Sequence, residues 1–236
     1  MTIKLYPEFN DVFADETLKG IFFPLCSLTL EKYPNKIFHF ISSNGLWIDE
    51  NHQTEQNTFN YALFDIQENK YRFNGNIQLY KGFEQAKNIF DELQKDMDNN
   101  GKSYLEKKTK TDDYIKKQKQ NLNLKTDDEF DADYYLQTFY EFSINRLNFK
   151  YKNEFGAFRK IIDGWSNSNK ESPIIYDETS NELKETLNHY DKPKFENIET
   201  FDLIGKIVGF EFFTDGNDTI LFYNNSDKIL CLNFYS

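Results

Sequence analysis

Cysteine is scarce in this chain: Cys26 and Cys231 are the only two among 236 residues. This number excludes a disulfide-rich scaffold, and the absence of a CxxC pair excludes the common zinc-ribbon spacing. Both cysteines stand among apolar neighbours near opposite ends of the chain, which predicts two buried, reduced thiols. Because buried thiols are poor nucleophiles, a catalytic Cys–His pair is disfavoured.

Glycine, proline and arginine are also few, with ten, five and three residues. The glycines are scattered singly, so the chain has neither a P-loop nor a GxGxxG phosphate cradle. The arginines are Arg72, Arg146 and Arg159, against 25 lysines, which disfavours an arginine-based site for phosphate or nucleic acid. No apolar run is long enough to cross a membrane, and no apolar signal segment follows Met1, so we expect a cytoplasmic protein.

Aromatic and acidic residues are abundant. The 24 Phe and 15 Tyr residues supply enough apolar area for a sizeable core, which excludes wholesale disorder. The 39 acidic and 28 basic residues leave a formal charge of −11. An acidic surface disfavours nucleic acid and anionic membranes and favours basic protein partners, although solubility alone is the simpler explanation. The excess of Phe, Tyr, Ile, Asn and Lys is typical of AT-rich codons and indicates a low-GC bacterium.

Apolar segments near both ends of the chain predict β-strands. In the first part they are 20–26, 36–41, 46–48, 59–66 and 71–80, and intervening turn residues favour an antiparallel meander. Pro24 predicts an edge or a bulge in the first of them. In the last part they are 203–213, 219–223 and 229–235. The two β regions could belong to one sheet or to two.

The middle of the chain has helical periodicity. Apolar residues predict a helix over 83–98, with Asn99-Asn100-Gly101 as its stop. A second helix is expected from about residue 127 to the mid-140s, with Thr126 as N-cap and Glu129 completing a capping box. Residues 155–162 suggest a third helix. The lysine-rich segment 102–126 predicts either an exposed helix or a linker.

These elements predict an α+β protein with antiparallel β-sheet segments near both ends and a central helical region. We expect a single α+β domain over 1–236. The polar, basic stretch 102–126 is the candidate internal boundary.

The three histidines, His39, His52 and His189, show no metal-ligand spacing such as HExxH. His39 stands between Phe38 and Phe40 in a strand pattern, which predicts a structural role. No GxSxG elbow is present either, so we expect no catalytic residue, no metal site and no cofactor. If the protein is an enzyme of unfamiliar type, the candidate groups are His52 as base and the acids Asp49, Glu50, Asp215 and Asp218.

Acidic residues concentrate at the expected start of the second helix, at Asp127, Asp128, Glu129, Asp131 and Asp133. Carboxylates at a helix N-terminus stabilise the helix dipole, which explains them without any partner. The spacing lacks the glycine and the final glutamate of an EF-hand, so metal binding is the weakest alternative. The functional alternative is a docking surface for a basic partner, flanked by Tyr134 and Tyr140 as exposed aromatic area.

The last stretch, 201–236, resembles the end of the YwqG-like family of bacterial proteins. The matching features are a strand, the acidic turn Asp215-Gly216, the aromatic strand Leu221-Phe222-Tyr223 and a final apolar strand over 229–234. Residues 158–165 are similar to a Lys-Ile-Gly-Gly segment of that family, with Asp163 in place of the first glycine and without the proline and glutamine that follow. The resemblance covers at most a third of the chain. It implies a fold rather than an activity, because the family has no known reaction.

Acidic charge, bacterial composition and the lack of an export signal or catalytic motif favour a non-enzymatic, cytoplasmic binding protein. The leading hypothesis is an immunity protein of interbacterial competition, which binds and neutralises a basic toxin domain as in a toxin–antitoxin pair. We expect neither nucleic acid nor a membrane as partner, and the oligomeric state stays open. The alternatives are an accessory or structural protein of a bacterial complex and an enzyme of unfamiliar type.

Overall fold

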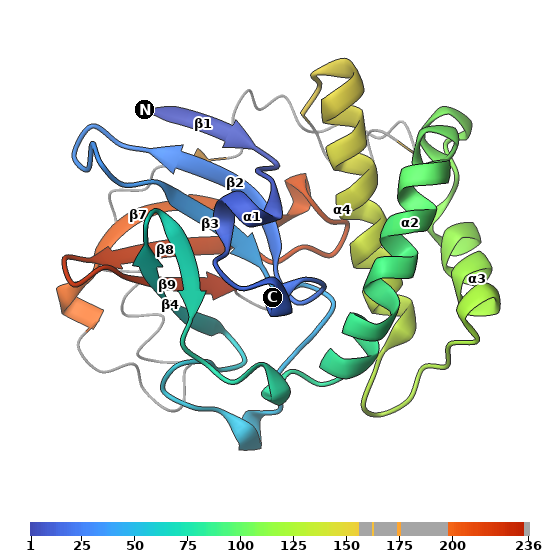
Figure 1. Ribbon diagram of the computed structural model, residues 1–236, viewed down its shortest axis with the longest axis horizontal. Coiled ribbons are helices and arrows are strands. Elements are labelled where there is room, and N and C mark those ends of the chain that lie inside the picture. Colours follow the sequence, from blue (N-terminus) through green and yellow to red (C-terminus); the bar gives the residue numbers. More distant parts are fainter. Residues whose placement is uncertain (156–161, 163–173, 176–197, 234–236) are drawn as a thin grey trace.

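Two antiparallel sheets form the β part of the molecule (Figure 1). The computed structural model describes residues 1–155, 162, 174–175 and 198–233. The first sheet has the order β1-β2-β3, with β1 at Thr2–Leu5, β2 at Phe23–Thr29 and β3 at Phe38–Ser42. The second has the order β5-β4-β9-β8-β7-β6. Its strands are β4 Tyr61–Gln67, β5 Lys70–Phe73, β6 Ile174–Ile175, β7 Asp202–Ile207, β8 Thr219–Asn224 and β9 Lys228–Asn233.

The second sheet joins strands from both halves of the chain. The β4–β5 hairpin pairs through β4 with β9, so that Leu63 lies opposite Leu230. The predicted N-terminal meander is therefore wrong, because β3 and β4 belong to different sheets and β4 finds its second neighbour more than 150 residues along the chain. β1 was not predicted. The bulge expected at Pro24 is confirmed by a register shift between Pro24 and Cys26.

Both faces of the second sheet carry buried apolar side chains. On one face Phe64, Leu221 and Cys231 belong to the main core, and on the other Leu63, Phe222 and Leu230 form a second cluster. Successive strand residues point to opposite faces, so a sheet buried on both faces requires continuous apolar runs. The strands predicted over 219–223 and 229–235 have that character.

The helices α2 (Phe83–Lys107), α3 (Thr111–Leu122) and α4 (Ala132–Lys152) lie together beside the sheets (Figure 1). A short helix, α1, spans Phe9–Val12. Helices in the middle and antiparallel strands near both ends make this an α+β protein, as predicted. No helix among the described residues is both long enough and apolar enough to span a bilayer.

The predicted stop of the first long helix is wrong. α2 continues through Asn99-Asn100-Gly101 and ends at Lys107. Gly101 is buried, and a Cβ atom there would lie 2.5 Å from Cδ1 of Leu147 on α4. A small residue at this position lets the two helices approach closely, so Gly101 serves packing rather than termination.

The predicted start of α4 is also wrong. The helix begins at Ala132, and its N-cap is Asp131 rather than Thr126, so the capping box with Glu129 does not form. The Asp127 side chain instead accepts backbone hydrogen bonds in a turn before the helix. Within 102–126 the structure has the end of α2 and the whole of α3, which buries Tyr114 and Gln118.

Several predicted strands are shorter than expected because single-turn 3₁₀ helices follow them. β5 ends at Phe73 before the turn Ile77–Leu79, and β7 ends at Ile207 before Gly209–Glu211. Residues 46–48 contribute only an isolated bridge, from Ile48 to Tyr80. The helix predicted over 155–162 and the end of the last strand lie largely outside the described residues.

Aromatic rings link the first sheet to the second. Phe22, just before β2, makes edge-on contacts with Phe64, Phe73 and Tyr80 at centroid distances of 5.2–5.6 Å. Such pairs stabilise beyond the area that they bury. Cys26 and Cys231 are free thiols in the same core, which confirms the prediction of buried, reduced cysteines.

Candidate functional site

The acidic segment 127–133 is a turn held in place from both sides. The Asp127 carboxylate accepts hydrogen bonds from the backbone N–H groups of Glu129 and Phe130 at 3.0 and 2.9 Å. The Phe130 ring is buried, which anchors the turn to the core. Asp131 then caps α4 by accepting the N–H of Tyr134 at 3.0 Å. Two of the five predicted carboxylates thus organise the backbone locally.

The other three carboxylates lie on the surface. Asp128, Glu129 and Asp133 are exposed. Asp133 pairs with Lys119 of α3 at 2.5 Å, with the lysine side chain 29% and the aspartate 53% exposed. Exposed pairs of this kind contribute little stability. Asp128 and Glu129 therefore present their charge at the tip of a constrained turn.

The start of α2 packs against this turn and adds another acid. Gly82, the N-cap of α2, has a φ of 75°, and a Cβ atom there would overlap the Phe130 ring and lie 3.1 Å from the Glu129 carbonyl oxygen. Glu84 is exposed in the first turn of α2, two residues beyond this contact. We call Glu84, Asp128, Glu129 and Asp133 the acidic edge. Sequence reasoning missed Glu84, because the contact between Gly82 and the turn depends on how the start of α2 packs.

The predicted aromatic flank is only partly present. Tyr134 is half-buried and its hydroxyl donates to Oδ1 of Asn44 at 2.8 Å, while burial raises its pKa to about 12. Tyr140 is fully buried, which contradicts its predicted exposure. Its ring stacks on Tyr114 at 4.2 Å, and its hydroxyl donates to the Thr109 carbonyl. Tyr140 joins α3 to α4 and is not available to a partner.

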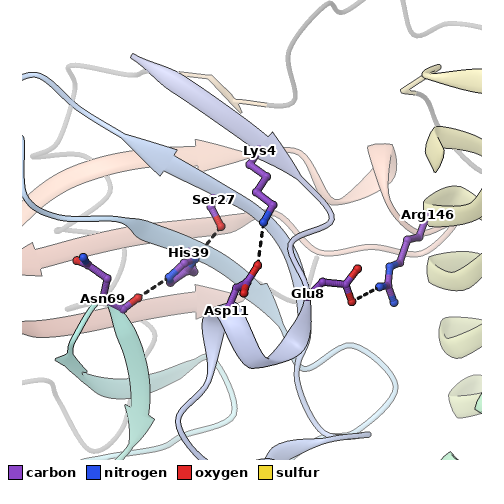
Figure 2. Close-up of polar contacts among 7 residues, drawn as sticks. All are labelled: Lys4, Glu8, Asp11, Ser27, His39, Asn69 and Arg146. Atoms are coloured by element: carbon purple, nitrogen blue, oxygen red, sulfur yellow. Dashed lines mark hydrogen bonds and ion pairs between the residues drawn. The ribbon is translucent and has the colours of Figure 1, made fainter.

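His39 of β3 forms buried polar contacts with Ser27 on the neighbouring strand β2 and with Asn69 in the turn between β4 and β5 (Figure 2). Its Nε2 atom lies 2.8 Å from the Asn69 carbonyl oxygen, which can only accept, so Nε2 carries the proton. Nδ1 consequently accepts from the Ser27 hydroxyl at 2.7 Å. Burial lowers the pKa of His39 to about 4 and keeps the ring neutral. The histidine is therefore structural, as predicted.

A serine hydroxyl bonded to a neutral imidazole is also the arrangement of a nucleophile with its base. Here Ser27 is 6% and His39 2% exposed, so a substrate would not reach the hydroxyl in this conformation. The pair arises because Ser27 and His39 are directly opposite in the β2–β3 register. Sequence reasoning missed Ser27, since nothing in the local pattern reveals that register.

The acids considered for catalysis have structural partners where the structure describes their side chains. Asp49 accepts the Asn51 N–H at 2.9 Å and pairs with Lys81 at 3.3 Å, contacts that lower its pKa. Asp218 pairs with Lys206 at 2.6 Å, and Asp215 accepts from Gln137 at 2.9 Å. His52 is exposed. Across the described part of the chain, no three His, Cys, Asp or Glu side chains gather closely enough to hold a metal ion.

Comparison with known proteins adds no relative. No family model matches the sequence, and neither a curated protein nor a solved structure matches it significantly. The resemblance of 201–236 to the YwqG-like family therefore stays a prediction.

Proposed function

We propose that this protein is a cytoplasmic, non-enzymatic binding protein that neutralises a basic partner, such as a toxin domain used in interbacterial competition. The observation that carries the proposal is the acidic edge, where the start of α2 packs against the constrained turn before α4 and both segments carry exposed carboxylates. A pre-organised surface loses little conformational entropy when it binds. The overall charge of −11 would also accelerate association with a basic partner.

Asp128 and Glu129 are the positions that test this proposal. Both are exposed, and neither side chain organises the turn, which Asp127, Phe130 and Asp131 hold. The double variant Asp128→Lys/Glu129→Lys should therefore fold normally while reversing the charge of the edge. The matched control is Glu55→Lys/Glu154→Lys, which makes the same charge change at exposed positions outside the acidic edge.

The experiment has two steps. Tagged protein first captures its partner from the native lysate at low salt, and mass spectrometry identifies that partner. Stopped-flow kinetics with the purified partner then compare the variants. We expect the edge variant to associate about tenfold more slowly at low salt, and the control to stay within about twofold of the unaltered protein. An acidic or neutral partner, or equal rates for the two variants, would contradict the proposal.

A further inference from the structure

A large cavity lies between the N-terminal segment and the helices α2 and α4. Its volume is about 740 Å³, within the roughly 300–1,000 Å³ that small-molecule sites occupy. Aromatic side chains form part of the wall. Phe9, Phe90 and Phe149 are partly exposed there, whereas Phe22, Phe23, Phe139 and Phe142 line the cavity while almost fully buried. Such a wall favours the apolar part of a ligand, because contact between apolar surface and water is unfavourable.

One arginine of the chain lies in the wall of this cavity. Arg146 of α4 reaches toward Glu8, and its Nη2 atom lies 2.5 Å from Oε2 of Glu8 (Figure 2). The arginine side chain is 35% exposed and the glutamate 70%, so the cation is the less exposed partner of the pair. An ion pair with so exposed an acid contributes little to stability. A carboxylate that arrives with an apolar body can therefore replace Glu8 on Arg146.

The other charged groups of the wall are paired or exposed, and Lys19 is as exposed as Arg146, at 35%. Lys19 pairs with Glu16 at 3.2 Å and stands over the Phe9 ring. Asp98 is exposed and accepts from Gln94 at 2.8 Å, and Asp91 and Lys150 are exposed. Arg146 differs from Lys19 and Lys150 in its planar guanidinium, which can hold a carboxylate through two parallel hydrogen bonds.

The backbone that carries Glu8 is strained where it lines the cavity. Tyr6 has a φ of 47°, a left-handed conformation that is unfavourable for a bulky residue, and Pro7 follows it. The Tyr6 ring is fixed by edge-on and tilted contacts with Phe142 and Phe149, at 5.8 and 5.7 Å. Backbone strain that packing holds in place is concentrated at ligand sites. Here it directs the chain so that Glu8 meets Arg146.

We propose that this cavity binds a small amphipathic carboxylate, with the apolar body among the phenylalanine rings and the carboxylate on Arg146 in place of Glu8. The proposal does not depend on the acidic edge, and binding at one site can be lost without loss at the other.

Calorimetric titration with dodecanoate and with dodecanol tests the two halves of the proposal. The unaltered protein is expected to bind dodecanoate at least tenfold more tightly than dodecanol, because only the acid pairs with Arg146. Arg146→Gln should weaken dodecanoate binding about tenfold and leave dodecanol unchanged. Arg72→Gln is the matched control, since Arg72 is exposed on β5 and takes no part in the cavity wall.

Two more variants separate occupation of the cavity from misfolding. Gln94→Trp places a large ring in the wall from α2 and should abolish binding of both probes. Glu8→Gln removes the competing carboxylate and should tighten dodecanoate binding several-fold, a gain that a misfolded protein would not show. The proposal is overturned if neither probe binds saturably, if acid and alcohol bind alike, or if Gln94→Trp leaves binding intact.

Discussion

At the scale of single residues, burial explains the chemistry of His39 and of the two cysteines. The imidazole is neutral because its surroundings penalise charge, and the Asn69 carbonyl selects its tautomer. Burial likewise raises the pKa of Cys231 to about 12, and raises the pKa of Cys26 further. The apolar neighbours of all three were visible in the sequence, whereas the partners of His39 were not.

His39 should make the protein less stable in mild acid. Its pKa is about 4 in the folded state and near the ordinary 6.5 in the unfolded chain, so the unfolded chain takes up the proton first as the pH falls. This contribution is complete above pH 6.5 and is lost as the pH falls toward 4. Urea denaturation should show that lowering the pH from 7 to 5 costs the unaltered protein about 2 kcal/mol more than His39→Gln. Equal losses would show that His39 is not held neutral.

At the scale of elements, one carboxylate of α2 forms several of the polar contacts between that helix and α3. Asp96 accepts hydrogen bonds from Tyr104, Lys117 and Gln118 at 2.7–2.9 Å, and two of these donors, Lys117 and Gln118, belong to α3. The stacked Tyr114 and Tyr140 rings join α3 to α4. The lysine-rich segment 102–126 was predicted to be an exposed helix or a linker. Its helix α3 instead packs against both α2 and α4.

Removing that carboxylate should loosen α3. Asp96→Ala leaves Gln118, which is 2% exposed, without its acceptor, and we expect a loss of about 2–3 kcal/mol in unfolding free energy. Hydrogen exchange should accelerate first over 111–122. The control Asp98→Ala, on the same helix but exposed, should stay within about 0.5 kcal/mol. If both variants lose equal stability and residues 111–122 stay protected from hydrogen exchange, Asp96 does not hold α3 in place.

α4 shows the limit of periodicity for predicting packing. Its apolar stripe was evident, but the helix also buries Thr138, Glu141 and Asn145. Glu141 accepts the backbone N–H of Thr214 at 2.5 Å, and Asn145 donates to the Phe212 carbonyl at 2.6 Å. Glu141 and Asn145 thus pair backbone groups of the β7–β8 connection, which lies outside the strand ladders. From the sequence alone, a polar residue in a predicted helix is expected to be exposed, because its tertiary hydrogen-bond partner is not known.

At the scale of the whole molecule, one continuous core connects both sheets and the helices. Cys26 of β2 and Cys231 of β9 belong to that core, and Cys231 Sγ lies 3.5 Å from the Ile41 carbonyl oxygen of β3. The thiols therefore report on the opening of two different sheets that share one interior.

Thiol alkylation, followed by mass spectrometry of the two cysteine peptides, measures this cooperativity. In the native protein both thiols should react about a hundredfold or more slowly than in denaturing urea, because each is fully buried. Their native rates should agree within about threefold, since opening either sheet breaks the same core. A much faster rate at one cysteine would mean that the two sheets open independently.

The sequence by itself determined the fold class, the main strands and helices, the buried cysteines, the structural role of His39 and the acidic stretch, because these follow from local periodicity, composition and turn chemistry. Tertiary structure decided that β4 pairs with β9, that Gly101 serves packing, that Gly82 of α2 contacts the acidic turn and that Arg146 meets Glu8. These are contacts between residues far apart in the chain. Their free energy depends on which surfaces fold against each other, and no local pattern contains that information.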